Sequence, residues 1–171
     1  MRYTSLMRVF VVAIAGLFVA NQASAQTGLT AELDPFQEIP PHNTPGYGSA
    51  DLTLTGNTLS INLGTGIYND LLAGASTVRL QDAPIGMNGA TVGLFNLDTP
   101  GNTSGTFSGS VAGLTAGQLS DLLAGNMYIN ITDPVYPSGE IRGQIEVPEP
   151  GSLAILAGAG LLAMRRRRAL A

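Results

Sequence analysis

Residues 51–63 read DLTLTGNTLSINL, and this stretch decides the fold class. Leucine and isoleucine alternate with polar residues on both sides of Gly56-Asn57. Successive side chains of a strand point to opposite faces, so the pattern predicts two strands with one apolar face each. A glycine in the first position of a two-residue loop fits a type II′ turn, which would join the strands as a hairpin. The side chains expected to face the core are Leu52, Leu54, Leu59, Ile61 and Leu63.

The same alternation returns late in the chain, at residues 127–132 and 140–146. Weaker strand patterns lie at 29–33, 77–80, 91–97 and 106–111. About eight short strands at close spacing predict an all-β, antiparallel sandwich or barrel. One short helix is expected between them, because Thr115 and Gln118 form a capping box, three leucines follow, and Gly125 can end the helix.

Composition limits the chemistry of the central domain. Residues 26–146 hold two arginines, Arg79 and Arg142, against eleven acidic residues, which gives a net charge of about −9. Such a domain does not bind nucleic acid by neutralising phosphates. The chain has no cysteine, so disulfides and thiol catalysis are excluded. The length suits one domain with its own core.

The first 25 residues have the parts of a Sec signal peptide. Two arginines precede an apolar run at residues 9–20, and Ala23 and Ala25 present the small side chains that signal peptidase accepts. We expect cleavage between Ala25 and Gln26. The alternative is an uncleaved N-terminal anchor, which the short apolar run and the well-formed cleavage site disfavour.

The other end of the chain, residues 147–171, reads VPEPGSLAILAGAGLLAMRRRRALA. Its apolar run, residues 153–164, would form about 18 Å of helix, which is short against the roughly 30 Å of hydrocarbon in a bilayer. The stop-transfer residues Arg165, Arg166, Arg167 and Arg168 would stay on the cytoplasmic side. The domain would then lie outside the inner membrane and the arginines inside.

The motif before this apolar run consists of Val147, Pro148, Glu149 and Pro150. Two prolines one residue apart cannot continue a strand or sit inside a helix, so they form a rigid peptide that an enzyme can recognise. This motif, the short apolar helix and the basic cluster together resemble the PEP-CTERM sorting signal of Gram-negative bacteria, over residues 147–169. The resemblance implies an exosortase, a membrane-embedded cysteine peptidase that removes the tail, and a link to exopolysaccharide and biofilm production. An ordinary one-helix anchor is the alternative.

Motifs across the middle of the chain resemble the chordin-type CHRD domain. They are EIPP at 38–41, GSADLTL at 48–54, MNG at 87–89, MYINI at 127–131 and PSGEIRGQI at 137–145. The resemblance covers residues 28–146 and implies a β-sandwich like those of immunoglobulins and Cu,Zn-superoxide dismutase. The expected domains are a signal peptide (1–25), a CHRD-like sandwich with one short helix (26–146) and a sorting or anchor segment (147–171). Helices are expected at the two ends, a signal helix and a short apolar helix.

Many bacterial members of that family carry His-x-His on one strand and a third histidine on a late strand. Alternate residues of a strand share a face, so such a set could hold a metal ion. Here Arg79, Gln81 and Thr132 stand at those positions, and none of these residue types is a good metal ligand. We therefore expect no metal and no cofactor.

Other candidate catalytic groups are few. His42 is the single histidine and lies in a proline-rich loop, where we expect it to be solvated. With no cysteine and no second histidine, Ser/His/Asp and Cys/His sets are impossible. Glu38 and Asp82 are expected to be surface charges, and Glu140 and Arg142 a cross-strand pair. We expect no catalytic residues.

Three functions are compatible with these features. The first is an exported, non-enzymatic envelope or exopolysaccharide-matrix protein that an exosortase sorts. The second is an adhesion or ligand-binding module, anchored permanently by a single C-terminal transmembrane helix. The third is a hydrolase or redox enzyme, which the lack of catalytic sets disfavours. The expected partners are the Sec translocon, signal peptidase, exosortase and the inner membrane, with exopolysaccharide as a candidate. The expected location is the inner membrane, then the cell surface or extracellular matrix.

Overall fold

The computed structural model describes residues 26–148 of the chain. The proposed signal peptide with Ala23 and Ala25 lies outside the described residues. So do Glu149, Pro150, the apolar run and Arg165–Arg168. Among the described residues, no helix has both the length and the apolar character needed to cross a membrane.

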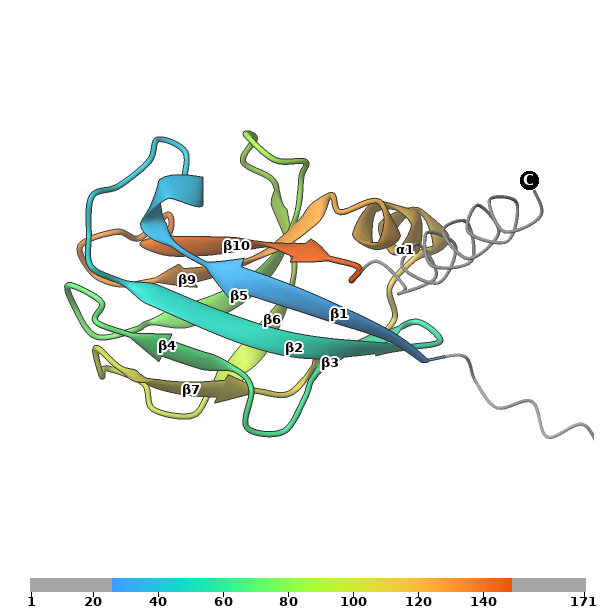
Figure 1. The fold of residues 1–171 in the computed structure, drawn as a ribbon, viewed down its shortest axis with the longest axis horizontal. Helices are drawn as coiled ribbons and strands as arrows, with labels where there is room; N and C mark the ends of the chain where they lie inside the picture. Colours follow the sequence, from blue (N-terminus) through green and yellow to red (C-terminus); the bar gives the residue numbers. More distant parts are fainter. Residues whose placement is uncertain (1–25, 149–171) are drawn as a thin grey trace, which may run out of the picture.

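The described residues form ten strands and two short helices (Figure 1). The strands are β1 (Gln26–Leu33), β2 (Tyr47–Thr55), β3 (Thr58–Ile61), β4 (Ile67–Asn69), β5 (Thr77–Asp82), β6 (Ala90–Leu97), β7 (Gly105–Ser108), β8 (Ser110–Val111), β9 (Met127–Thr132) and β10 (Ile141–Glu146). The helices are the 3-10 turn η1 (Pro35–Gln37) and α1 (Ala116–Leu123).

Eight of these strands close into an antiparallel barrel. The order β1-β10-β9-β5-β6-β7-β4-β2 returns to its start, because β2 also pairs with β1. The strand β3 pairs with residues 52–55 of β2, the part that β4 leaves unpaired, and β8 pairs with β3. The expectation of an all-β protein with one short helix is confirmed, but the expectation of a β-sandwich is wrong.

The closure depends on two long neighbouring strands. Along its whole length β1 pairs with β2, from Gln26↔Thr55 to Leu33↔Gly48, and its other edge pairs with β10 at Thr30 and Ala31. A strand that is paired on both edges cannot be the border of a sheet. The hydrogen-bond ladder therefore runs round the molecule, whereas the two sheets of a sandwich would keep open edges.

The predicted hairpin is confirmed, with one exception at its end. Gly56 has φ +61° and occupies the first position of the two-residue loop between β2 and β3, as a type II′ turn requires. The four apolar side chains nearest the turn are buried, but Leu63 is fully exposed. The strand β3 already ends at Ile61, and the Thr65 N–H donates to the Asn62 carbonyl at 3.1 Å. This turn holds Leu63 at its tip, so the alternation of the strand no longer applies.

The helix prediction is confirmed at its N-terminus. Thr115 and Gln118 make both hydrogen bonds of the capping box, and Gly125 follows the helix with φ +75°. Leu122 is fully buried in the core, whereas Leu123 is about half exposed. The helix therefore contributes Leu122 to the core beside the end of the barrel, and the partly buried Leu119 packs against that core (Figure 1).

The strands β9 and β10 are buried on both faces. Their inward side chains, such as Ile129 and Ile141, belong to the apolar core. Their outward side chains, such as Asn130 and Arg142, are also only 2% and 1% exposed. Outward residues of a barrel wall normally face water, so the burial of polar groups here means that other segments of the chain cover this wall.

Candidate functional site

A polar surface runs across the outside of three neighbouring strands, and we call it the outer polar face. The registers place Arg79 opposite Asn130 and Asn130 opposite Arg142, so these side chains point to the same side. The members of the face are Thr77, Arg79, Gln81, Tyr128, Asn130, Thr132, Arg142 and Gln144. The segment around η1 and the loop 83–89 cover part of this face and bury its polar groups.

Arg142 is the central cation of the outer polar face. Its guanidinium lies 3.4 Å from the centroid of the Tyr128 ring, in a cation–π arrangement worth about 2 kcal/mol when it is shielded from water. It donates to the carbonyls of Met87 at 2.7 Å and Pro84 at 3.3 Å, and to Gln144 Oε1 at 3.1 Å. Burial lowers the pKa of Arg142, while Tyr128 and Glu38 oppose that change. The arginine thus holds the loop 83–89 against β10.

Glu38 was expected to be a surface charge, and this expectation is wrong. Its side chain is only 3% exposed, because the chain after η1 folds back over β10. Burial raises the pKa of Glu38 to about 7, although Arg142 and the Ile39 N–H act in the opposite direction. The arrangement keeps a carboxyl group close to a buried guanidinium at the edge of the outer polar face.

Two neighbouring buried oxygens, one of them from Glu38 itself, have no hydrogen-bond partner among the described residues. They are Oε1 of Glu38 and Oδ1 of Asn130. A Cβ atom on Gly139 would lie 2.4 Å from the first and 2.3 Å from the second. The two oxygens are therefore at most about 4.7 Å apart, the sum of these distances. An unsatisfied buried acceptor costs about 1–3 kcal/mol, which protonation of Glu38 would relieve if the new O–H donated to Asn130.

The side chain of Gln37 replaces a missing pair of ladder hydrogen bonds between β1 and β10. The bridge between Asp34 and Arg142 continues the register of these strands, but Glu32 and Gln144 do not pair directly. Instead, the Gln37 amide donates to the Glu32 carbonyl at 2.8 Å and accepts the Gln144 N–H at 3.0 Å. This inserted amide fixes η1 on the wall of the barrel. The hydrogen-bond ladder between β1 and β10 therefore also sets the positions of the residues next to Gln37.

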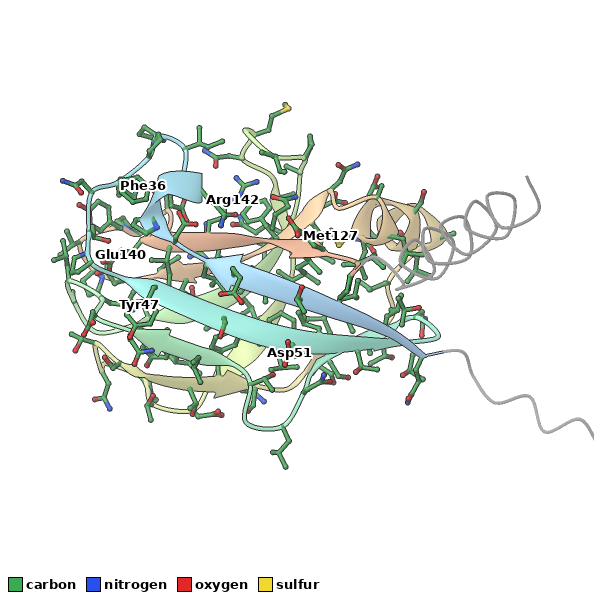
Figure 2. All side chains as sticks on the ribbon, in the orientation of Figure 1. Phe36, Tyr47, Asp51, Met127, Glu140 and Arg142 are labelled. Carbon is green, nitrogen blue, oxygen red and sulfur yellow. The ribbon has the colours of Figure 1, made fainter. Side chains whose placement is uncertain are left out.

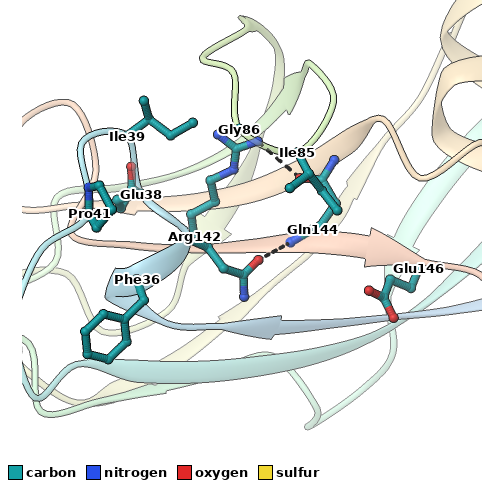
Figure 3. Close-up of a pocket in the computed structure, with 10 residues that line it drawn as sticks. Phe36, Glu38, Ile39, Pro41, Ile85, Gly86, Arg142, Gln144 and Glu146 are labelled. Carbon is teal, nitrogen blue, oxygen red and sulfur yellow. Dashed lines mark hydrogen bonds between the residues drawn. The ribbon is translucent and has the colours of Figure 1, made fainter.

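An open cleft of about 490 Å³ lies between η1 and the loop 83–89 (Figure 3). We call it the η1 cleft. Its polar floor comes from β10 and the segment after η1, and its apolar rim from both covering segments. The floor contains Glu38, Arg142 and Gln144, and the rim contains Phe36, Ile39 and Ile85. The Asn88 side-chain N–H donates to the Ile39 carbonyl at 3.0 Å and so joins the two sides of the cleft.

A second buried acidic group lies toward the end of the barrel where β2 begins, away from Arg142 (Figure 2). Both oxygens of Glu140 accept the Leu72 N–H at 3.0 Å, and Asp133 Oδ2 accepts the Ala73 N–H at 3.0 Å. Burial is the main cause that raises the pKa of Glu140, and Asp133 raises it further. Glu140 and Arg142 thus bind different loops, instead of forming the expected cross-strand pair. The carboxylates attach the segment 70–75 to the barrel, which is a structural task.

The positions predicted from the family's histidine pattern lie on the outer polar face. Thr132 Oγ1 is 2.7 Å from Thr77 Oγ1, and the Arg79 Nε–H donates to that same Thr77 oxygen at 3.1 Å. The Gln81 amide donates to the Gly89 carbonyl at 3.1 Å. These side chains are therefore engaged in ordinary hydrogen bonds. In residues 26–148 no three His, Asp or Glu side chains come together as a metal site would need, and the absence of a metal stays a prediction.

The other candidate residues do not meet in one place. His42 is partly buried and stacks on Tyr136, with 4.2 Å between the ring centroids. Asp82 ends β5. Partial burial is the main cause that raises the pKa of Asp82, and the charge of the nearby Asp121 raises it further. Val147 and Pro148, the described part of the predicted sorting motif, are exposed directly after β10. The η1 cleft is thus the strongest candidate for a functional site, because it can hold and orient a ligand.

Comparison with known proteins gives two matches. The family model of the CHRD domain matches residues 29–145. The family model of the PEP-CTERM protein-sorting motif matches residues 146–168. No curated protein and no solved structure matches the chain.

Proposed function

The chain belongs to the CHRD domain family and carries a PEP-CTERM protein-sorting motif, and from this premise we propose that it is a non-enzymatic protein of the cell envelope or exopolysaccharide matrix. The motif implies an exported, surface-associated protein that an exosortase-type system processes. We also propose that the domain has a binding or structural task instead of a catalytic one, and that the C-terminal tail is a temporary anchor.

The observation that carries the proposal is where the sorting motif begins. The barrel ends with β10 at Glu146, and the matched motif covers residues 146–168. Val147 and Pro148 are exposed, so a peptidase at the membrane face could reach them without opening the barrel. Cleavage after β10 would remove no core side chain, because Ile145 is the last residue of the core. A tail placed in this way suits removal.

The anchoring step follows from the physics of the tail sequence. The run of residues 153–164 is short for a bilayer, so its retention would depend on Arg165–Arg168 at the cytoplasmic face. Sec export and signal peptidase cleavage after Ala25 would place the barrel on the outer side. Exosortase would then release it to the surface or matrix. The second candidate, an adhesion module with a permanent one-helix anchor, differs only in keeping the tail.

The non-enzymatic part of the proposal is supported by residue types. The chain has one histidine and no cysteine, and the two carboxyl groups whose pKa burial raises to about 7 lie in separate places, Glu38 in the η1 cleft and Glu140 near Asp133. General acid–base catalysis by two carboxyl groups needs both at one reacting centre. Glu140 and Asp133 instead accept the backbone N–H groups of Leu72 and Ala73.

Intact-mass analysis of the protein from its native host tests the proposal. The mature wild-type protein should lack residues from about Val147 onward. Replacing Pro148-Glu149-Pro150 by three alanines should leave the protein in the membrane with its tail attached, because helix and arginines remain. Replacing Arg165–Arg168 by serine should weaken membrane retention instead. Pro100→Ala, in an exposed turn of the barrel, is the matched control and should be processed normally.

A mature wild-type protein that still carries residues 165–171 would reject the temporary anchor. That mass would favour the permanently anchored module. Catalytic turnover of a surface polymer by the purified protein would reject the non-enzymatic role.

A further inference from the structure

Part of β1 has a free edge beside the start of the C-terminal tail. The strand pairs with β2 along its whole length, but on its other edge the pairing with β10 reaches only as far as Thr30. In the part of the chain that the structure describes, residues 26–29 have no strand partner on this edge. Figure 1 shows that β1 continues past the end of β10, where the tail begins after Glu146. A free strand edge is a template for any extended peptide, and the tail is the nearest one.

The register shows which residue of the tail would meet this edge. Thr30 lies opposite Glu146, and the two strands are antiparallel. Each step back along β1 therefore corresponds to one step forward along the chain after β10. If the pairing continued for two more residues, Gly28 would lie opposite Pro148.

Hydrogen bonds between β1 and β10 belong to every second pair. The Asp34 N–H donates to the Arg142 carbonyl at 3.0 Å, and the Arg142 N–H donates to the Asp34 carbonyl at 3.1 Å. In an antiparallel ladder such bonded pairs alternate with pairs that exchange no hydrogen bonds. Steps of two residues lead from Asp34 to Thr30 and then to Gly28. The N–H and C=O groups of Gly28 therefore point away from β2, toward the place that the tail would take.

Pro148 stands at one of these hydrogen-bonding positions. A proline has no N–H to donate, and in sheets it is confined to positions whose N–H side faces solvent. Here that side would face β1, so Pro148 cannot donate to the Gly28 carbonyl. Pro150 lies outside the described residues, and the same register would place it opposite Gln26, at the next bonded position. Both N–H donors that could join the tail to the free edge are thus missing.

The residue between the prolines opposes the same pairing for a different reason. Ile145 belongs to the core, and alternate residues of a strand share a face, so a continued strand would place Glu149 on the inner side. An inward-pointing charge is one of the features that prevent pairing at a sheet edge. The whole Pro-Glu-Pro motif therefore acts against an extension of β10.

A tail paired with β1 would be a poor substrate. A peptidase acts on the open form of a segment, so cleavage of a paired tail would first require the hydrogen bonds to β1 to open. Val147 and Pro148 are exposed instead, directly after the last paired residue of β10.

We propose that Pro148 and Pro150 are positioning residues, which hold the sorting segment off the free edge of β1 and so keep it available to the peptidase. The inference rests on the processing proposed above. It gives the two prolines a task toward their own barrel, separate from recognition of the motif by the enzyme.

Hydrogen exchange of the Gly28 amide tests where the tail lies. The full chain is purified in detergent from a host without an exosortase, so that the tail stays attached, and exchange is followed by NMR. The exposed Gly28 amide should exchange rapidly in the wild type. A double variant with Pro148→Val and Pro150→Val supplies both donors and favours a strand, so the Gly28 amide should exchange at least about tenfold more slowly. The amide of Thr27 points toward β2 and should exchange at the same rate in both proteins.

Glu149→Ala is the matched control for this measurement. It alters the same motif but keeps both prolines, so the exchange of the Gly28 amide should remain as fast as in the wild type. Equally fast exchange in the double variant and the wild type would overturn the proposal. Slow exchange of this amide in the wild type would also overturn it, because the edge would then be occupied in spite of the prolines.

A rescue variant separates positioning from direct recognition of the prolines. In the native host, intact-mass analysis should show that the double variant is processed at least about tenfold more slowly than the wild type. Adding Gly28→Pro places a proline ring on the free edge of β1, where a Cβ atom meets no other atom within 4 Å. This third substitution should block the pairing and restore processing.

Unchanged processing of the double variant would overturn the positioning role. So would a failure of Gly28→Pro to restore processing, because the enzyme would then read the prolines themselves. A wild-type protein that keeps its tail would instead reject the processing proposed above, while the exchange of the Gly28 amide would still report on the pairing. The two proposals therefore fail separately.

Discussion

The buried carboxyl group of Glu38 should make the stability of the barrel depend on pH. Burial raises the pKa of Glu38 from its ordinary value of 4.5 to about 7. A group with a raised pKa binds its proton more tightly in the folded protein than in the unfolded chain. The unfolded chain therefore binds fewer protons between pH 4.5 and 7, and the free energy of unfolding falls as the pH rises through this window.

The size of this effect follows from the same two values. A difference of one bound proton changes the free energy of unfolding by about 1.4 kcal/mol per pH unit, so the change in pKa from 4.5 to about 7 corresponds to roughly 3–4 kcal/mol at most. The stabilising contribution is fully present below pH 4.5 and lost above pH 7. For a domain of this size, 3 kcal/mol corresponds to roughly 10 °C in the melting temperature.

Glu38→Gln should remove this dependence. The amide has the shape of the protonated acid, carries no charge at any pH, and can donate to the unpartnered Oδ1 of Asn130. Urea unfolding of residues 26–148 at pH 4.5 and pH 8 should show a loss of stability that is smaller in Glu38→Gln than in the wild type, by about 3 kcal/mol. Glu32→Gln, at an exposed position of β1, is the control and should follow the wild type.

Equal pH dependence of Glu38→Gln and the wild type would refute the reasoning. It would mean that water or a movement of the segment after η1 keeps Glu38 ionised in the folded protein. A variant that is less stable than the wild type at pH 8 would also refute it, because the neutral side chain should be favoured there.

Three further predictions concern the barrel and its chemistry. Ile129→Ala should lower the free energy of unfolding by about 2–4 kcal/mol in urea denaturation, because the side chain is fully buried; Leu63→Ala, which is fully exposed, should change it by less than about 0.5 kcal/mol. Gly139→Ala should cost about 2 kcal/mol or more, because its φ is +147° and a Cβ would lie 2.3 Å from Asn130 Oδ1; a loss below 0.5 kcal/mol would mean that the 133–140 loop can shift. Calorimetric titration of residues 26–148 with zinc and copper should show no tight one-to-one binding, and such binding would expose a ligand set that the chain's single histidine does not suggest.

Part of the η1 cleft could have been expected from the sequence and part could not. Arg142 and Gln144 alternate with Gly143 and Ile145, so their common face was predictable from the period of a strand. Polar residues on the outer face of a strand ordinarily imply water, however. Here the segment after η1 and the loop 83–89 cover them, and each cover is separated from β10 by more than fifty residues of chain. The burial of Glu38 is therefore a property of the assembled barrel.

What the sequence determined by itself is local. The alternation and Gly56 specify the hairpin, Thr115 and Gln118 specify the start of α1, and the tail motif specifies the sorting signal. Each of these depends on neighbours a few residues apart, where side-chain spacing and backbone preference decide the outcome. The tertiary structure alone decided that the strands close into a barrel. Closure depends on which strand edges meet, as β1 meets both β2 and β10, and period-two alternation is the same in a sandwich and in a barrel.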